Sequence, residues 1–343
     1  MPTYALLIAP SANRVYADAS VALLTSELAV FNHTILGGRL ADIAERTIAG
    51  VRYVGFHADA LSDEDIAALA NLSALYVLFE VREDLLRPLE ATGLDRFSSD
   101  LVSIPKYAGK TNEQFTKLLL NVTAVSTDVP AAFLTTRLRV LDPMCGRGTT
   151  LNQAMTYGFD ATGVDIDGKD FDAYSAFIRT WLKTKRHKHT AEVVPLRRNR
   201  VRLGRRLDVT VAGTAQAYKA GDVQRISFLN ADTLHSAEIF KPAAFDVVVT
   251  DLPYGVQHGS RQHTSLSRSP LKLLAEAVGR WARLVRPGGA LGLSWNTFGG
   301  SRDQVAEILA GAGFEPLTDP CYAGFAHRVD QAITRDLMVA RRS

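Results

Sequence analysis

The sequence predicts an α/β protein in which a small α+β domain over residues 1–104 precedes a doubly wound sheet over residues 105–343. The main observation is that strand and helix patterns alternate after residue 105, which is typical of a mostly parallel sheet with helices on both faces. The length of 343 residues is too great for one small core. The 47% of hydrophobic and 22% of charged residues match an ordinary soluble globular protein.

The first part of the chain contains strand and helix patterns without this regular alternation. Residues 4–9 and 75–81 have the length and apolar character of short strands. Helices are predicted over residues 18–31 and 62–72, and Ser62 is the expected N-cap of the second. We therefore expect a small accessory α+β domain here.

The second part opens with a helix predicted over residues 109–125, where Phe115, Leu118, Leu119 and Val122 repeat at helical spacing. Strands are then predicted at residues 137–144, 160–167, 225–232, 245–255 and 289–296, with a closing pair near 314 and 337–340. Helices are predicted between them at residues 149–157, 170–183, 271–284 and 303–312. Ligands of such sheets bind at the carboxyl ends of the strands, so we expect functional residues there.

Positive charge is concentrated between the second and third strands of this sheet. Residues 179–206 hold eleven Lys and Arg against one acidic residue, a net charge of +10, whereas residues 1–100 have a net charge of −7. The basic segment over residues 179–206 can bind a polyanion, although a solvated, flexible loop is the alternative. We expect an insertion over about residues 179–223, in which residues 206–213 can add a strand or hairpin. The candidate contacts to a polyanionic substrate are Arg186, Lys188, Arg197 and Arg198.

Composition disfavours several classes of protein. No apolar run approaches the ~18 residues that a membrane-spanning helix needs, and the N-terminus lacks the basic leader of a signal peptide. Two cysteines, Cys145 and Cys321, can make neither a disulfide framework nor a zinc site by themselves. We therefore expect a cytoplasmic protein without a membrane partner or a bound metal, and the sequence leaves its oligomeric state open.

The first motif, VLDPMCGRGTT, covers residues 140–150. A buried strand ends at Asp142, and two glycines then let the backbone turn tightly into a helix, so that bare amides face a ligand. The dinucleotide pattern G-x-G-x-x-G fails because Leu151 stands at its third glycine, and a phosphate loop ending at Thr111 fails because Ile104 stands at its first. The candidate cofactor-binding residues here are Asp142, Pro143, Cys145, Gly146, Gly148 and Thr149.

Two more acidic residues follow the next strands. Asp165, followed by Ile166, ends the second strand, where a carboxylate can accept both hydroxyls of a ribose. Asp232 ends the third strand, where a carboxylate can accept the amine of an adenine ring. Either acid alone can equally be a helix cap. Together with Asp142 they occupy three consecutive strand ends, which favours an adenosine-containing ligand.

The motifs LDPMCGRGTT, GVDID, NAD and TDLPYG, in this order and spacing, resemble the class I S-adenosylmethionine-dependent methyltransferases. The last is similar to the [Asp/Asn/Ser]-[Pro/Ile/Leu]-Pro-[Tyr/Phe/Trp] signature of enzymes that methylate exocyclic amines. Within that group, the chain most resembles the THUMP-associated tRNA guanosine N2-methyltransferases, and residues 104–121 look like the lead-in helix of a bacterial branch. The resemblance covers residues 101–340. It implies a Rossmann-like sheet, S-adenosylmethionine as cofactor and RNA, first of all tRNA, as partner.

The motif TDLPYG suits the chemistry of an aromatic amine, whose lone pair is delocalised into its ring. Asp251 and the backbone carbonyl of Leu252 can accept the two N–H groups and so align the lone pair. Pro253 fixes the turn, and Tyr254 can stack on the base. Leu252 departs from the commoner proline of the signature, but only its carbonyl is needed. His258 lies in the following loop and can contact base or phosphate, or simply face solvent.

The sequence therefore predicts methyl transfer to an exocyclic amine of a nucleobase, with guanine N2 in tRNA as first candidate. Guanine N2 in rRNA is an alternative. Methylation of adenine N6 or cytosine N4 in DNA is another, disfavoured because the insertion is small for a DNA-recognition domain. A catalytically silent RNA-binding protein is the alternative of a different class. The resemblance implies a ferredoxin-like element plus a THUMP module, which together need more than the ~100 residues of the acidic first part, so we expect a reduced or divergent RNA-binding module there.

Overall fold

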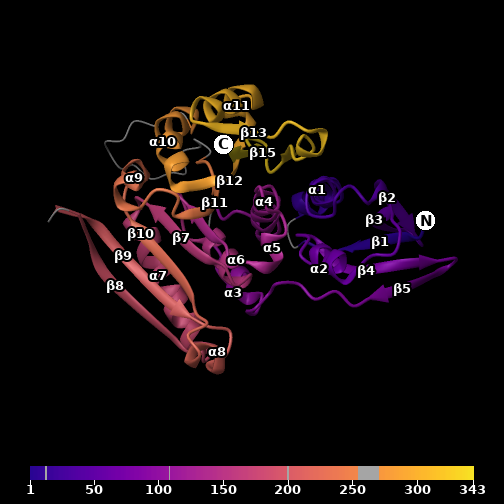
Figure 1. Cartoon of the computed structure of the whole chain (residues 1–343), viewed down its shortest axis with the longest axis horizontal. Helices are drawn as coiled ribbons and strands as arrows, with labels where there is room; N and C mark the ends of the chain where they lie inside the picture. The colour runs from indigo at the N-terminus through magenta and orange to yellow at the C-terminus, as the bar shows by residue number, and fades with distance from the viewer. Residues whose placement is uncertain (12–13, 108, 199–200, 254–269) are drawn as a thin grey trace.

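The computed structural model describes residues 1–11, 14–107, 109–198, 201–253 and 270–343, apart from the side chains of Arg14, Arg198 and Arg202. In this part of the chain the strands form two sheets, one of five strands and one of ten. Figure 1 shows the five-stranded sheet near the N-terminus and the ten-stranded sheet in the rest of the chain.

The five-stranded sheet is antiparallel and packs against two helices. Its order is β2 (Ala41–Ile48), β3 (Val51–His57), β1 (Thr3–Ile8), β4 (Leu75–Arg82) and β5 (Leu85–Leu89). The helices are α1 (Arg14–His33) and α2 (Asp63–Leu69), and Ser62 caps α2 as predicted. β2, β3 and β5 are absent from the predicted elements. β2 and β5 are largely exposed and lack a regular apolar alternation, and Gly55 interrupts β3.

The ten-stranded sheet has five parallel strands at its centre. In spatial order these are β10 (Gln224–Asn230), β7 (Asp160–Asp165), β6 (Arg139–Asp142), β11 (Phe245–Asp251) and β12 (Val285–Asn296). Beyond β12, β15 (Thr334–Arg342) and β13 (Phe314–Pro316) run antiparallel, and β14 (His327–Arg328) pairs with β15. The chain winds outward from β6 in one direction and from β11 in the other. Their adjacent carboxyl ends are therefore the switch point at which doubly wound sheets bind ligands.

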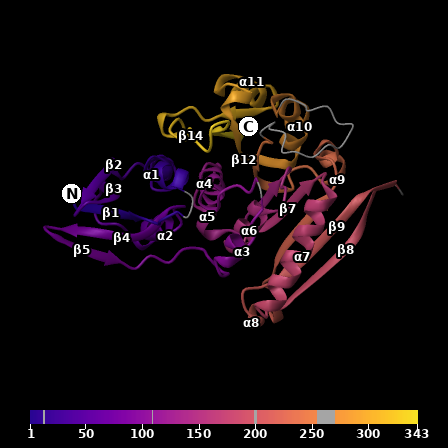
Figure 2. The same ribbon diagram turned by 180° about the vertical axis from the view of Figure 1, so that it is seen from behind.

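Helices cover both faces of this sheet (Figures 1 and 2). Val247 and Val249 of β11 pack in one apolar cluster with α4 (Glu113–Ala124), α6 (Thr149–Thr156) and α7 (Gly168–Thr184). Val248 packs in a second cluster with α10 (Pro270–Leu284) and α11 (Arg302–Gly311). The alternation along one strand confirms the predicted doubly wound, Rossmann-like fold. The short helical elements are α3 (Asp100–Ser103), α5 (Ala132–Thr135), α9 (Ser236–Ile239), η1 (Thr233–His235), η2 (Thr297–Gly299) and η3 (Pro320–Tyr322).

The insertion between α7 and β10 is a long hairpin followed by a short helix. β8 (His189–Arg198) and β9 (Val201–Val211) pair with each other, and β9 extends the sheet by pairing with β10. α8 (Ala215–Lys219) then leads into β10. The insertion starts later than residue 179, because residues 179–184 complete α7, where Trp181 and Leu182 are buried. The strand expected at residues 206–213 is the second half of β9.

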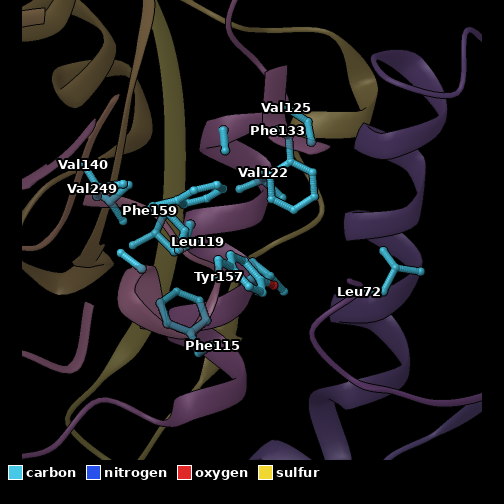
Figure 3. Packing of buried hydrophobic residues seen from close by; sticks show 14 of the residues in the cluster. Leu72, Phe115, Leu119, Val122, Val125, Phe133, Val140, Tyr157, Phe159 and Val249 are labelled. Carbon is cyan, nitrogen blue, oxygen red and sulfur yellow. The ribbon is translucent and has the colours of Figure 1, made fainter. Parts of the chain in front are cut away.

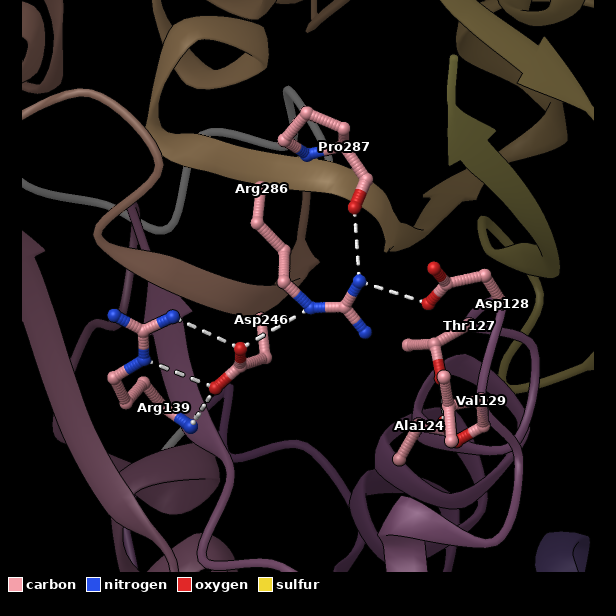
Figure 4. Close-up of polar contacts among 8 residues, drawn as sticks. All are labelled: Ala124, Thr127, Asp128, Val129, Arg139, Asp246, Arg286 and Pro287. Carbon is pink, nitrogen blue, oxygen red and sulfur yellow. Dashed lines mark hydrogen bonds and ion pairs between the residues drawn. The ribbon is translucent and has the colours of Figure 1, made fainter.

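Ion pairs join the amino ends of the central strands (Figure 4). Asp246 of β11 accepts hydrogen bonds from the backbone and the guanidinium of Arg139, at the start of β6. Arg286, at the start of β12, lies 3.3 Å from Asp246 and 2.8 Å from Asp128. Burial would raise the pKa of Asp246, but these arginine contacts hold it below its ordinary value. The network stabilises the edge of the sheet opposite the switch point.

The two sheets share one hydrophobic core at the packing of α1 against α4. Phe31 of α1 lies edge-on to Phe133, with ring centres 6.0 Å apart, and Phe133 packs against Tyr157 (Figure 3). Next to these rings, the fully buried Glu27 accepts a hydrogen bond of 2.7 Å from Asn121 of α4. The first part of the chain is therefore packed against the larger sheet through apolar and buried polar contacts.

Candidate active site

A pocket of about 290 Å³ opens at the carboxyl ends of β6 and β11, the predicted switch point. Its walls come from four separate segments of the chain. They are α4 and the stretch before it (Tyr107, Gly109, Thr111, Thr116, Leu119), the segment that begins at the end of β6 (Asp142, Met144, Cys145, Gly146, Arg147, Thr149, Thr150), Asp170 of α7 and the end of β11 (Asp251, Leu252, Pro253). The structure therefore brings the first and the last predicted motif together in one cavity.

The loop after β6 has the tight geometry that its glycines predict. Gly146 and Gly148 have φ of +50° and +76°, which side chains rarely tolerate. A Cβ on Gly148 would also lie 2.6 Å from the ring of Tyr174. The backbone amide of Gly146 donates to Asp165, 2.8 Å away, which joins this loop to the end of β7. Thr149 begins α6 as predicted.

Asp142 is buried at the base of the pocket, with Pro143 and Cys145 beside it also buried. Its carboxylate accepts hydrogen bonds from the amide of Met144 at 3.1 Å and the hydroxyl of Thr250 at 3.0 Å. Burial raises the pKa of Asp142 to about 7. Burial likewise raises the pKa of the Cys145 thiol well above its ordinary value, which disfavours a nucleophilic role.

Asp165, Ile166 and Asp232 lie at the same edge of the sheet but outside the walls of the pocket. Both carboxylate oxygens of Asp165 accept backbone amides, from Gly146 and Asp167, and burial raises its pKa. Ile166 is 71% exposed. Asp232 caps η1 by accepting a hydrogen bond from the amide of Leu234. This contact corresponds to the helix-cap alternative of the sequence analysis.

Among the described residues, three side chains hold Asp251, at the end of β11. Thr111 donates to its Oδ2 at 2.7 Å, Ser294 donates to its Oδ1, and Arg335 lies 3.4 Å from Oδ2. The backbone amide of Leu252 donates to the carbonyl of Ser294 at 2.8 Å, which fixes the turn after Asp251.

The other predicted catalytic residues take different positions. The side chain of Leu252 is buried, whereas Pro253 is exposed at the pocket. Tyr254 and His258 lie outside the described residues.

Several residues of the site are missing from the sequence-based candidates, among them Tyr107, Thr111, Ser294 and Arg335. The hydroxyls of Tyr107 and Thr149 form a hydrogen bond of 2.9 Å, and the guanidinium of Arg147 lies over the ring of Tyr107. Thr111, Ser294 and Arg335 contact Asp251. The sequence contains a signal for Tyr107 and Thr111, because both lie within residues 104–121, which resemble the lead-in helix of a bacterial branch of the family.

The hairpin separates the four basic residues expected to contact substrate. Arg205 of β9 is level with Asn230 at the carboxyl end of β10, so residues 201–204 extend beyond the edge that holds the pocket. Arg197 and Arg198 pair with this projecting end. Arg186 and Lys188 precede β8 at the opposite edge, roughly 30 Å away along nine residues of strand. The predicted single basic patch is therefore two separate groups.

Several positive charges of the insertion are neutralised within the protein. Arg205 pairs with Asp172 at 2.8 Å and lies over the ring of Phe171, and Arg206 pairs with Asp208 at 2.7 Å. Lys185 pairs with Asp100. Among the described side chains, the exposed Arg186, Lys188 and Arg197 have no ion pair.

In the described ranges, no helix is both long enough and apolar enough to cross a bilayer. Nor do the residues described there bring together three or more His, Cys, Asp or Glu side chains that could hold a metal ion.

Residues 129–289 match the family model of the RMKL-like methyltransferase domain, whereas no curated protein compared with the chain matches it. Similar solved structures include TehB from Haemophilus influenzae, at 14% identity over 62% of this chain and 60% of that chain, with a TM-score of 0.36. Magnesium protoporphyrin IX methyltransferase from Synechocystis, solved with bound S-adenosylmethionine, is 15% identical over 69% of this chain and 87% of its own, with a TM-score of 0.40. N-methyltransferase NodS from Bradyrhizobium japonicum is 12% identical over 67% and 94%, with a TM-score of 0.38. The chain thus spans less than two thirds of TehB.

The segment that matches the family model contains the glycine loop, all three strand-end acids and Asp251. These residues lie where the fold binds ligands, and the match confirms the predicted methyltransferase chemistry. Residues 129–289 therefore match an RMKL-like methyltransferase domain, which supports the predicted class I S-adenosylmethionine-dependent chemistry with S-adenosylmethionine as cofactor.

Proposed function

We propose that this methyltransferase acts on an exocyclic amine of a nucleobase, with guanine N2 in tRNA as its first substrate. The observation that carries the proposal is the fixed position of Asp251 in the wall of the pocket, next to the loop after β6. An acceptor carboxylate followed by Leu252, Pro253 and an aromatic residue is the arrangement that an aromatic amine needs.

The residues around the pocket fit a cationic adenosine-containing cofactor. Three carboxylates, those of Asp142, Asp170 and Asp251, line it together with one arginine, Arg147. When bound, S-adenosylmethionine supplies an electrophilic methyl group on a positively charged sulfur. We assign the loop from Asp142 to Thr149 to hold it, with Asp165, Ile166 and Asp232 contacting its adenosine.

On the substrate side, Asp251 accepts one N–H of the amine and the carbonyl of Leu252 accepts the other. This directs the nitrogen lone pair toward the methyl carbon. With S-adenosylmethionine bound, the N–C bond would form as the S–C bond breaks, S-adenosylhomocysteine would be the leaving group, and the methylated nitrogen would lose one proton to water. Tyr254 is proposed to stack on the base.

An RNA substrate is supported by the basic end of the hairpin. Near its tip, beyond the sheet edge that holds the pocket, Arg197 pairs with Arg202 and Arg198 with Val201. A nucleic acid whose target base enters the pocket could therefore place nearby phosphates against these arginines. Arg186 and Lys188 are not part of this proposed contact.

The proposal is tested with purified protein and S-adenosylmethionine carrying a tritiated methyl group. Bulk tRNA, rRNA and genomic DNA are the three acceptors. We expect label in tRNA with wild type and a loss of at least about 100-fold for Asp251→Ala. Asp172→Ala, which removes an exposed carboxylate, is the matched control and should retain activity. Label only in rRNA or DNA would overturn the tRNA assignment, and no label in any pool would overturn the nucleobase assignment.

A further inference from the structure

A buried arginine connects Asp251 to the first part of the chain. Arg335 of β15 has a side chain only 3% exposed, and its Nη2 lies 3.4 Å from Oδ2 of Asp251. Its Nη1 donates to the hydroxyl of Tyr16, on α1. Two polar contacts thus join helix α1 to an acid that lies in the wall of the pocket.

Aromatic packing holds this connection in place. The guanidinium of Arg335 lies over the ring of Phe115, 4.6 Å from its centre. His327 packs against Tyr16 and Phe115, with ring centres 5.4 and 5.2 Å away. Burial lowers the pKa of His327 to about 4, so its ring adds no second positive charge beside Arg335 at neutral pH.

The contacts around Asp251 leave its carboxylate little rotational freedom. Ser294 holds one oxygen, while Thr111 and Arg335 hold the other. The direction of the remaining lone pairs decides whether an amine N–H is accepted in line with methyl transfer. A displacement of ~1 Å at such a group can cost about 100-fold in rate.

We infer that Tyr16 and Arg335 are positioning residues for methyl transfer: α1 holds Arg335, and Arg335 orients the Asp251 carboxylate toward the substrate amine. This inference rests on the proposed function of Asp251. It gives the first part of the chain a role in catalysis that does not require it to touch RNA.

The test compares two buried tyrosines. Tyr16→Phe removes the hydroxyl that Arg335 contacts. Tyr322→Phe, the matched control, removes a buried hydroxyl that lies 2.7 Å from Ser126. With bulk tRNA as acceptor, we expect Tyr16→Phe to lower kcat about 10-fold while KM for tRNA and for S-adenosylmethionine stays within about twofold. Tyr322→Phe should leave kcat unchanged. An unchanged kcat for Tyr16→Phe, or equal losses in both variants, would overturn the inference.

Arginine variants give a second comparison, because Arg302 of α11 pairs with Asp336, the neighbour of Arg335 on β15. Arg335→Lys keeps the positive charge but loses the second donor, so it should lower kcat in the same way as Tyr16→Phe. Arg302→Lys alters the neighbouring ion pair with Asp336, 2.9 Å apart, and is expected to leave kcat unchanged. A loss of kcat for Arg302→Lys equal to that for Arg335→Lys would indicate a general structural effect and contradict the inference.

A stability measurement separates failure of this inference from failure of the proposed function. If wild type methylates no nucleic acid, the proposed function fails, but the connection is still tested by thermal unfolding. The effects of Tyr16→Phe and Asp251→Asn on Tm should depart from additivity by at least about 1 °C, because both act on Arg335. Tyr322→Phe and Asp251→Asn should be additive. Additive effects for the first pair would overturn the connection itself.

Discussion

Asp142 should make the affinity of the pocket for its cofactor depend on pH. Burial raises the pKa of this carboxyl to about 7, so near neutral pH it is only partly ionised. A cationic ligand favours the ionised form, so affinity for S-adenosylmethionine should rise by about tenfold from pH 6 to pH 8. Calorimetric titration at the two pH values measures this rise. It should disappear in Asp142→Asn, and a flat wild-type profile would contradict a contact between Asp142 and the cofactor.

The stability of the ligand-free protein should change in the opposite direction. Because the pKa of Asp142 is higher in the folded than in the unfolded state, folding favours its protonated form. Its contribution to stability is therefore lost as pH rises from about 4 to about 7. We expect Asp142→Asn to gain Tm relative to wild type over this range and to hold that gain above it. A difference in Tm that is constant with pH would show that Asp142 is not buried as described.

Gly148 is required for two reasons that a control can separate. Its φ of +76° disfavours any side chain, and a Cβ would meet the buried ring of Tyr174 at 2.6 Å. Gly221 has nearly the same φ, +78°, but nothing within 4 Å. Gly148→Ala should weaken binding of S-adenosylmethionine by at least about 10-fold, whereas Gly221→Ala should cost only about 1 kcal/mol of stability. Equal stability losses and unchanged cofactor binding would count against this role of the loop.

The packing of α1 on α4 depends on a buried carboxylate. Glu27 accepts hydrogen bonds from the amide and hydroxyl of Ser73 and from Asn121, and burial raises its pKa. Glu27→Ala would leave these donors unpaired and should lower the free energy of unfolding by about 2–4 kcal/mol. Urea denaturation measures the change. Glu90→Ala, an exposed control, should stay within about 0.5 kcal/mol, and a similarly small effect at Glu27 would refute this account of the packing.

The hairpin makes a prediction about salt dependence. Only its tip projects past the sheet edge that holds the pocket, so only charges there should contact RNA phosphates. Replacing Arg197 and Arg198 together by Ala should reduce the slope of log affinity against log salt by about 1.4 for single-stranded RNA. Arg186→Ala with Lys188→Ala is the matched control and should leave the slope unchanged. Equal reductions in both would argue against the assignment of the tip.

The strands predicted from the sequence are present in the structure where the apolar pattern of the sequence agrees with the burial of the strand. Apolar runs bounded by strand-end acids predict β6, β7, β10 and β11, because parallel strands buried on both faces leave a strong signal. β2 leaves none, since no residue of Ala41–Ile48 is buried and its apolar residues do not alternate regularly. The charge of the insertion was visible in the sequence. The division of its basic residues into two groups could not be predicted from the sequence, because it follows from the length and strand pairing of the hairpin.

The site was predictable to the extent that its residues are contiguous in the chain. The loop from Asp142 to Thr149 and the run from Asp251 to Pro253 are short motifs with a stated chemistry. Thr111, Arg335 and Tyr16 do not belong to such motifs, because their contacts join distant parts of the chain. Thr111 and Arg335 contact Asp251 across 140 and 84 positions, and Arg335 contacts Tyr16 across 319. Such contacts arise from the tertiary packing of α1, α4 and β15 and leave no local periodicity.

In the proposed function, the pocket, the amine-accepting motif and the basic tip of the hairpin act together at one edge of the larger sheet. We would test this combination first by nucleoside mass spectrometry of tRNA, rRNA and genomic DNA from a strain that lacks the protein. The strain would be complemented with wild type or with Asp251→Ala. The account predicts that N2-methylguanosine is lost from tRNA and restored by wild type alone. Unchanged N2-methylguanosine in tRNA would contradict it, as would full restoration by Asp251→Ala.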